Sequence, residues 1–233
     1  MGNALAVGGL TNLPSVEVNF GDYGSDFDFV PRIQLVTKGK YVDQGKITPG
    51  HYGVPQGEDE ILDLGDSIDI LPLAVRNKAL DTNSDPPVAV YDTADPLYGL
   101  IVERAGQKDS GCMWGPSFLV WERDTEEFYE LFLGNKSGRV ESKKFEPYLP
   151  VSEERAAKFG VEPKGPTALT LTSRYIQGRY NWHVPVVNRC STPVENLPDG
   201  AFVVSQITRF LETKSDGAGE AKTAKAAKKT RSR

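Results

Sequence analysis

The sequence predicts a strand-rich α+β domain, in which a small barrel is elaborated with extra hairpins, short peripheral helices and a C-terminal helix. From Pro31 onward, short apolar runs alternate with clusters of turn-forming residues, a pattern typical of strands joined by tight connections. Six or more such runs accompany only two or three helical patterns. A small barrel, such as an OB-fold, is an economical way to remove the free edges of so many short strands.

The first half of this region contains four candidate strands. They are PRIQLVTKG from Pro31, HYGVP from His51, SIDILPLAV from Ser67 and PVAVYD from Pro87. Pro72 lies inside the third strand and indicates an edge position or a bulge, because proline cannot donate to a strand ladder. Asp95 and Pro96 supply an N-cap and a first-turn proline, which predict a short helix ending near Gly106.

The second half predicts two hairpins and two helices. SFLVWER and EEFYELFLG flank an Asp-Thr turn and form the first hairpin. Ser152 is the expected cap of a helix that stops at Gly160. Apolar residues from Phe202 to Leu211 recur at helical spacing, which indicates a C-terminal amphipathic helix.

The run from Pro163 to Arg189 contains no Asp or Glu, although the net charge of the chain is −5. Basic and aromatic residues are interleaved within it: Lys164, Arg174, Arg179 and Arg189 with Tyr175, Tyr180, Trp182 and His183. Cations that meet phosphates and rings that stack on bases are what a single-stranded nucleic acid requires of a protein. The alternative is that the aromatics face a core while the arginines are solvated.

A two-residue turn at Gln177-Gly178 would make this run a hairpin with a defined register. Tyr175 then faces Tyr180, Ser173 faces Trp182 and Leu171 faces Val184 on one side, while Arg174 faces Asn181 and Thr172 faces His183 on the other. This pairing separates the aromatic rings from most of the positive charge. The two groups could not then serve one ligand together.

A second basic cluster follows the strand FYELFLG and comprises Lys136, Arg139, Lys143 and Lys144, with Glu141 as its one acid. The segment GNKSGR has the glycine and asparagine content of a mobile loop, which could close over a phosphate chain. An ordinary solvated loop is the alternative. Trp121 is a further candidate stacking platform.

The two ends of the chain differ in charge from the region between them. Residues 1–28 contain four acids and no base and are expected to form a flexible acidic lead-in. Residues 29–213 are expected to form a single nucleic-acid-binding domain. The tail, residues 214–233, has seven Lys or Arg against Asp216 and Glu220. It cannot bury a core and is expected to be disordered, acting as a polyanion hook, a solubilising tail or a cover for the acidic body.

No pattern favours an enzyme, a metal site, a cofactor or a membrane anchor. Cys112, Cys190, His51 and His183 could nominally bind zinc, but none of them comes in the close pairs that zinc sites use. No run approaches a membrane span, and the N-terminus lacks the features of a signal peptide. A cytoplasmic location is therefore expected, with no catalytic residue and no bound cofactor.

Several segments resemble a family of proteins encoded by tailed phages and prophages. They are PRIQLVTKG, ITPGHYGVP, SGCMWGPSFLVWER, LFLGNKSGR and LTLTSRYIQGRYNWHVPVV. The resemblance spans Pro31 to Phe210, and in outline the chain is similar to phage single-stranded DNA-binding proteins with OB-folds. The resemblance implies the host bacterial cytoplasm as the location. The basic tail departs from the acidic tails that many such proteins use to recruit replication partners.

These observations together predict a non-sequence-specific single-stranded DNA-binding protein that supports DNA replication or recombination. The expected binding residues are Lys136, Arg139, Lys143, Lys144, Arg174, Tyr175, Arg179, Tyr180, Trp182 and His183. The expected partners are single-stranded DNA or RNA and replication or recombination proteins, with self-association left open. The alternative is a phage structural or host-interaction protein whose basic run contacts an acidic partner.

Overall fold

A computed structural model describes residues 30–212, except residues 58, 86, 179–180 and 191–196. The expected lead-in and basic tail lie outside the described residues. The strands are β1 (Arg32–Leu35), β2 (Tyr52–Pro55), β3 (Ile61–Gly65), β4 (Ser67–Asp81), β5 (Val88–Val90), β6 (Cys112–Glu122), β7 (Glu127–Phe132), β8 (Leu169–Ile176) and β9 (Trp182–Arg189). The helices are α1 (Lys40–Asp43), α2 (Pro96–Arg104), α3 (Lys136–Ser142), α4 (Glu153–Phe159) and α5 (Gly200–Glu212), with a 3-10 helix, η1, at Lys143–Tyr148.

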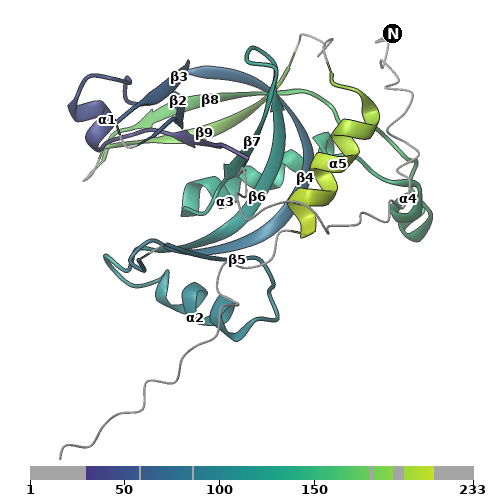
Figure 1. Ribbon diagram of the computed structural model, residues 1–233, viewed down its shortest axis with the longest axis horizontal. Helices are drawn as coiled ribbons and strands as arrows, with labels where there is room; N and C mark the ends of the chain where they lie inside the picture. The colour runs from purple at the N-terminus through teal and green to yellow at the C-terminus, as the bar shows by residue number, and fades with distance from the viewer. Residues whose placement is uncertain (1–29, 58, 86, 179–180, 191–196, 213–233) are drawn as a thin grey trace, which may run out of the picture.

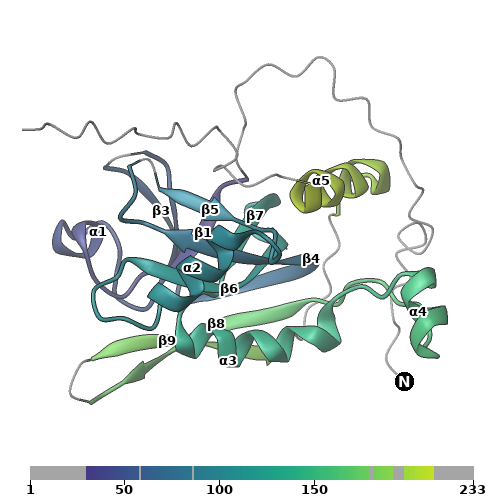
Figure 2. The ribbon, with the colours of Figure 1, turned by 90° about the horizontal axis from the view of Figure 1, so that it is seen from below.

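The strands form one mixed sheet in the order β3-β2-β1-β7-β6-β4-β8-β9, and β5 pairs with β4. The β1–β7 pair is parallel and the other pairs are antiparallel. The sheet is strongly curved, and Figures 1 and 2 show helices on both of its sides. The α+β, strand-rich class is confirmed, because strands dominate and helices are few.

The expectation of a small barrel is wrong for the described residues, since β3 and β9 stand at opposite ends of the strand order. The sheet stays open because a helix protects its β9 edge. Glu141 of α3 accepts a hydrogen bond from the backbone amide of Val187, and Pro185 has no amide to offer. A covered edge does not need a partner strand.

The inner face of the curved sheet holds the larger core. It collects apolar residues from β1, β2, β4, β6, β7 and β8, among them Ile33, Val54, Ile70 and Leu171. Phe145 of η1 enters this core and stacks on Phe118, with ring centroids 4.4 Å apart. Tyr52 is fully buried and its hydroxyl donates to the carbonyl of Thr172. The strands β1 and β2 are thereby fastened over β8.

The outer face is covered by α5, whose expected amphipathic pattern is confirmed. Val203, Val204 and Phe210 of this helix pack on Leu73 and Trp121 of β4 and β6. The helix covers β4, β6 and β7 but not the hairpin of β8 and β9, as Figure 1 shows. The outer face of that hairpin is therefore left without a covering helix among the described residues.

Most predicted elements are present at their expected positions. Asp95 caps α2 by accepting from the amide of Leu97, and Ser152 caps α4, which ends at Gly160 with a φ of 65°. Pro72 lies at a bulge in β4, where the register to β6 shifts, rather than on an edge strand. The mobile loop expected at GNKSGR is wrong, because Asn135 caps α3 with its side chain. Strand β3 was not predicted.

No helix among the described residues has both the length and the apolar content needed to cross a membrane.

Phe145 is expected to be essential for the stability of the inner core. Phe145→Ala would remove a fully buried ring and should lower the free energy of unfolding by about 3–5 kcal/mol, measured by urea denaturation. Phe159→Ala is a matched control, because Phe159 is 64% exposed and its loss should change that free energy by less than about 0.5 kcal/mol. Equal effects of the two substitutions would contradict the placement of η1.

Candidate nucleic-acid interface

The acid-free run forms a hairpin, as expected, but its register differs by three residues from the expected one. Tyr175 pairs with His183 and Ile176 with Trp182, instead of with Tyr180 and Arg179. The strands are joined by residues 177–181, so the predicted two-residue turn is wrong.

The physical reason for this register is Pro185. In the predicted register, Thr170 and Pro185 would form a hydrogen-bonded pair, in which proline has no amide to donate. In the structure Pro185 lies opposite Ser173. The amide of Val187 points away from β8 toward Glu141, so the nitrogen of Pro185 faces the same edge, which has no partner strand. The missing donor then costs the ladder nothing.

The shift redistributes the side chains between the two faces of the hairpin, because three is an odd number. Arg174 and Trp182 now share the outer face, in neighbouring cross-strand pairs. Tyr175 and His183 share the inner face, with ring centroids 5.2 Å apart. The predicted separation of Trp182 from Arg174 is therefore wrong.

Both aromatic side chains at this end of the hairpin are accessible. Tyr175 is 52% exposed and Trp182 is 39% exposed, and Arg174 is exposed as well. The inner core ends further back along the hairpin, at Leu171 and Val187. The alternative that Tyr175 and Trp182 are core residues is thus wrong. Arg179 and Tyr180 lie outside the described residues.

The basic cluster at the end of β7 is ordered, and part of it is structural. Arg139 donates to the carbonyls of Trp114 and Gly134, and its guanidinium lies 4.5 Å from the centroid of the Trp114 ring. A side chain at Gly115 would collide with Leu133 and approach Arg139, so this glycine permits the contact. Arg139 is better explained as a packing residue than as a phosphate contact.

The three lysines of this cluster lie on α3 and η1, beside β9. Lys144 forms an ion pair with Glu141 at 2.9 Å. The Glu141 carboxylate also accepts a hydrogen bond from the backbone amide of Val187. Lys136 and Lys143 are exposed. The two basic segments of the sequence are therefore neighbours in space, because α3 packs along β9, while Arg174 lies on the outer face.

Trp121 is not a stacking platform. It is buried in the outer core between α5 and the sheet, and its ring contacts Phe128 edge-on with centroids 4.8 Å apart. Trp114 is half-buried beneath Arg139. Trp182 is the tryptophan that a ligand on the surface can reach most easily.

The thiols and imidazoles are dispersed among other contacts. His51 lies 3.0 Å from the carboxylate of Asp63, and His183 packs against Gly50. Burial raises the pKa of the Cys112 thiol, and the nearby Asp81 carboxylate adds to this effect, so the reactive thiolate is disfavoured. Among the described residues, no group of three or more His, Cys, Asp or Glu side chains could hold a metal ion.

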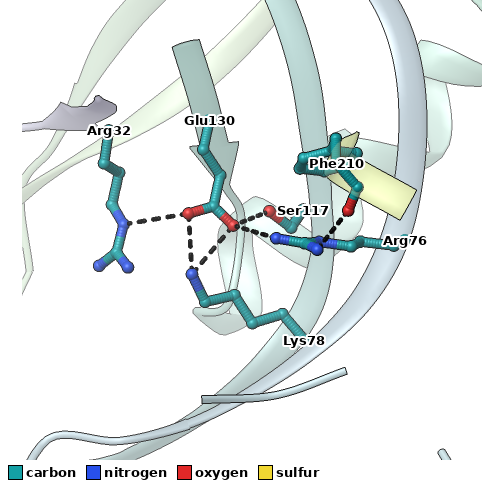
Figure 3. Close-up of polar contacts among 6 residues, drawn as sticks. All are labelled: Arg32, Arg76, Lys78, Ser117, Glu130 and Phe210. Atoms are coloured by element: carbon teal, nitrogen blue, oxygen red, sulfur yellow. Dashed lines mark hydrogen bonds and ion pairs between the residues drawn. The ribbon is translucent and has the colours of Figure 1, made fainter. Parts of the chain in front are cut away.

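A buried cluster of charged side chains in the fold was not predicted from the sequence. Figure 3 shows the carboxylate of Glu130, from β7, surrounded by Lys78, Arg76 and Arg32. The Lys78 ammonium donates to both carboxylate oxygens at 2.9 and 2.8 Å. Arg32 and Arg76 lie 3.7 and 3.8 Å away, and Ser117 donates a hydrogen bond. We call these five residues the Glu130 cluster.

The Glu130 cluster lies on the outer face, at the end of α5. Arg76 donates to the carbonyl of Phe210, and its guanidinium lies between the rings of Tyr91 and Phe210, at 3.6 and 4.1 Å from their centroids. A cation at a helix C-terminus interacts favourably with the helix dipole. The cluster thus fastens α5 to the sheet.

In this cluster, burial and the ion pairs shift the pKa values in opposite directions. Burial lowers the pKa of Lys78 to about 8, although Glu130 opposes the change. Burial alone would raise the pKa of Glu130, but the charge and the hydrogen bonds of Lys78 bring it below the usual value. Glu130 is therefore ionised at neutral pH and Lys78 is largely protonated.

Alternation along β4 could have revealed this cluster. The predicted strand ended at Val75, but the sequence continues to Asp81 without a glycine or a proline, and Arg76 and Lys78 then share a face. Such a pair of cations in a central strand indicates a buried partner acid.

No family model, curated protein or solved structure matches this chain.

Removing the carboxylate should destabilise the fold more than removing the lysine does. Glu130→Gln leaves two cations that are mostly buried without their counter-charge, which costs about 3–5 kcal/mol of unfolding free energy. Lys78→Met should cost less than half as much, because Arg76, Arg32 and Ser117 still contact Glu130. Denaturant titrations of both variants measure this order, and the reverse order would contradict it.

The lowered pKa of Lys78 should appear in the pH dependence of stability. The unfolded chain binds this proton up to its ordinary pKa of 10.5, and the folded protein only up to about 8. The contribution of Lys78 to stability therefore rises as the pH increases from about 8 toward 10.5 and is lost as the pH falls through that window. The unfolding free energies of the wild type and Lys78→Met should differ in slope between about pH 8 and pH 9.5.

Proposed function

We propose that the protein is a single-stranded nucleic-acid-binding protein without sequence preference, acting in DNA replication or recombination without chemistry of its own. The observation that carries this proposal is the shared outer face of Arg174 and Trp182 at the accessible end of the β8–β9 hairpin. A ring for a base and a cation for its phosphate lie side by side there. This is the combination that single-strand binding uses.

The surroundings of this face favour a polyanion. The hairpin contains no acidic residue. Asp69 of β4 accepts a hydrogen bond from Thr170 of the hairpin, but its charge is balanced by an ion pair with Arg123. Lys136 and Lys143 add positive charge on the helical segment along β9. The negative body of the protein would oppose association at other surfaces.

We also propose that the sheet is related to the OB-fold, as an open variant in which one edge is covered by a helix. OB-folds bind oligonucleotides on a curved strand surface, and the β8–β9 hairpin extends such a surface here. The bacterial cytoplasm and a phage or prophage origin are likewise proposed, on the resemblance of the sequence segments.

Two substitutions should separate stacking from charge. Trp182→Ala should weaken binding of a 30-nucleotide single strand by about 1–3 kcal/mol. Arg174→Ala should weaken binding across all sequences and lower the slope of log affinity against log salt by about one. Fluorescence anisotropy at several salt concentrations measures both quantities with the full chain.

Matched controls come from exposed residues elsewhere. Phe202→Ala removes an exposed ring on α5, and Lys158→Ala removes an exposed cation on α4; neither should change the affinity more than twofold. Quenching of tryptophan fluorescence by the oligonucleotide should disappear in Trp182→Phe, since Trp121 is buried and Trp114 lies beneath the guanidinium of Arg139. A protein truncated after residue 213 should retain binding that depends on Trp182.

Absence of single-strand binding by the folded, full-length wild type at low salt would refute the proposal. It would favour the alternative of a structural or host-interaction protein, in which the same basic hairpin contacts an acidic protein surface. Binding that survives Trp182→Ala and Arg174→Ala unchanged, but vanishes with residues 214–233, would place recognition in the tail.

A further inference from the structure

The accessible end of the hairpin carries an exposed ring on each of its two faces. Trp182 lies on the outer face beside Arg174, and Tyr175 lies on the inner face beside His183. A surface that binds one strand needs rings on one face. The second ring is therefore left unexplained by single-strand binding alone.

The part of the hairpin that carries these rings is a two-stranded arm. β8 pairs with β4 only from Leu169 to Thr172, whereas its pairing with β9 continues to Ile176. Beyond Thr172 the ladder therefore consists of two strands. Figure 2 shows this end of the hairpin extending past α3.

The base of the arm is held firmly. Thr172 accepts from the buried hydroxyl of Tyr52, and the turn at Gly50 is so close to His183 and Ser173 that a side chain there would collide with the imidazole. The φ of Gly50 is 94°, which also favours glycine. The base of the arm is therefore fixed to the rest of the sheet.

The thickness of such an arm suits a position between two nucleic-acid strands. A β-ribbon with side chains on both faces is about 10 Å thick, as judged from the spacing of packed sheets, whereas stacked base pairs are about 3.4 Å apart. Two strands that pass on opposite faces of the arm cannot remain paired. A ring on each face offers a stacking surface to each terminal base, similar in strength to the base-pair step that it replaces.

We propose that the preferred ligand is a junction between single-stranded and double-stranded nucleic acid, with the β8–β9 arm inserted as a wedge where the strands part. Trp182 and Arg174 bind the strand on the outer face. Tyr175 stacks on the terminal base of the other strand, whose phosphates approach the lysines of α3 and η1. This inference rests on the proposed function and defines its substrate.

The test compares three ligands with the full-length protein at one salt concentration: a 30-nucleotide single strand, a blunt duplex and a fork of equal total length. The fork should bind about tenfold or more tightly than the single strand. The fluorescence of a 2-aminopurine in the first base pair of the fork should change when the protein binds, because the ring of Tyr175 becomes a stacking partner of that base.

Tyr175→Ala is the decisive variant. It should bind the single strand within about twofold of the wild type, because Trp182 and Arg174 remain, but lose the preference for the fork and the 2-aminopurine signal. Tyr175→Phe keeps the ring and should retain both. Trp182→Ala should weaken binding to both ligands. Phe159→Ala, an exposed ring on α4, should change neither.

The outcomes separate this inference from the proposed function. Equal affinity for fork and single strand, or a fork preference that survives Tyr175→Ala in a protein with an unchanged circular dichroism spectrum, would overturn the wedge and leave single-strand binding intact. Failure to bind any single strand would overturn both.

Discussion

The arrangement of the whole molecule depends on one buried carboxylate, that of Glu130. It joins the cations of β1 and β4 to β7, and through Arg76 it reaches the C-terminal end of α5. Three cations around one carboxylate leave a surplus of positive charge. The aromatic rings of Tyr91 and Phe210 and the helix dipole offset part of that surplus. Because these contacts hold α5 over β4, β6 and β7, this helix does not cover the outer face of β8 and β9.

The β8–β9 hairpin, unlike the strands β4, β6 and β7, is not covered by α5. The inner core closes around Phe145 and needs no strand beyond Leu171 to complete it. The outer core is formed by α5 with β4 and β6, and Ala168, the residue before β8, packs against it. The end of the hairpin from Ser173 onward thus contributes little to either core, although it carries exposed rings. Packing in either core therefore does not account for the aromatic residues at Tyr175 and Trp182.

Much of the fold could be predicted from the sequence, because its signals were local. The Asp95 and Ser152 caps, the Gly160 stop and the first hairpin all follow from residues within one or two turns. The open sheet could not be predicted, nor could Glu130 be identified as the partner of the β4 cations, since both depend on strands that are distant in the sequence. At the candidate site, two residues that were predicted to contact nucleic acid have structural roles instead. Arg139 donates to the carbonyl of Trp114, and Trp121 belongs to the outer core.

The register of the hairpin shows how one backbone constraint determines a site. A Gln-Gly pair favours a two-residue turn by local preference, but that turn places Pro185 where β8 requires a donor. A lost ladder bond in a strand interior is unfavourable, and this cost opposes the local preference for the two-residue turn. Because the resulting shift is odd, Trp182 joins Arg174 and leaves Tyr175 on the other face. Pro185 contacts no ligand in this account, yet it gives the hairpin two aromatic faces rather than one.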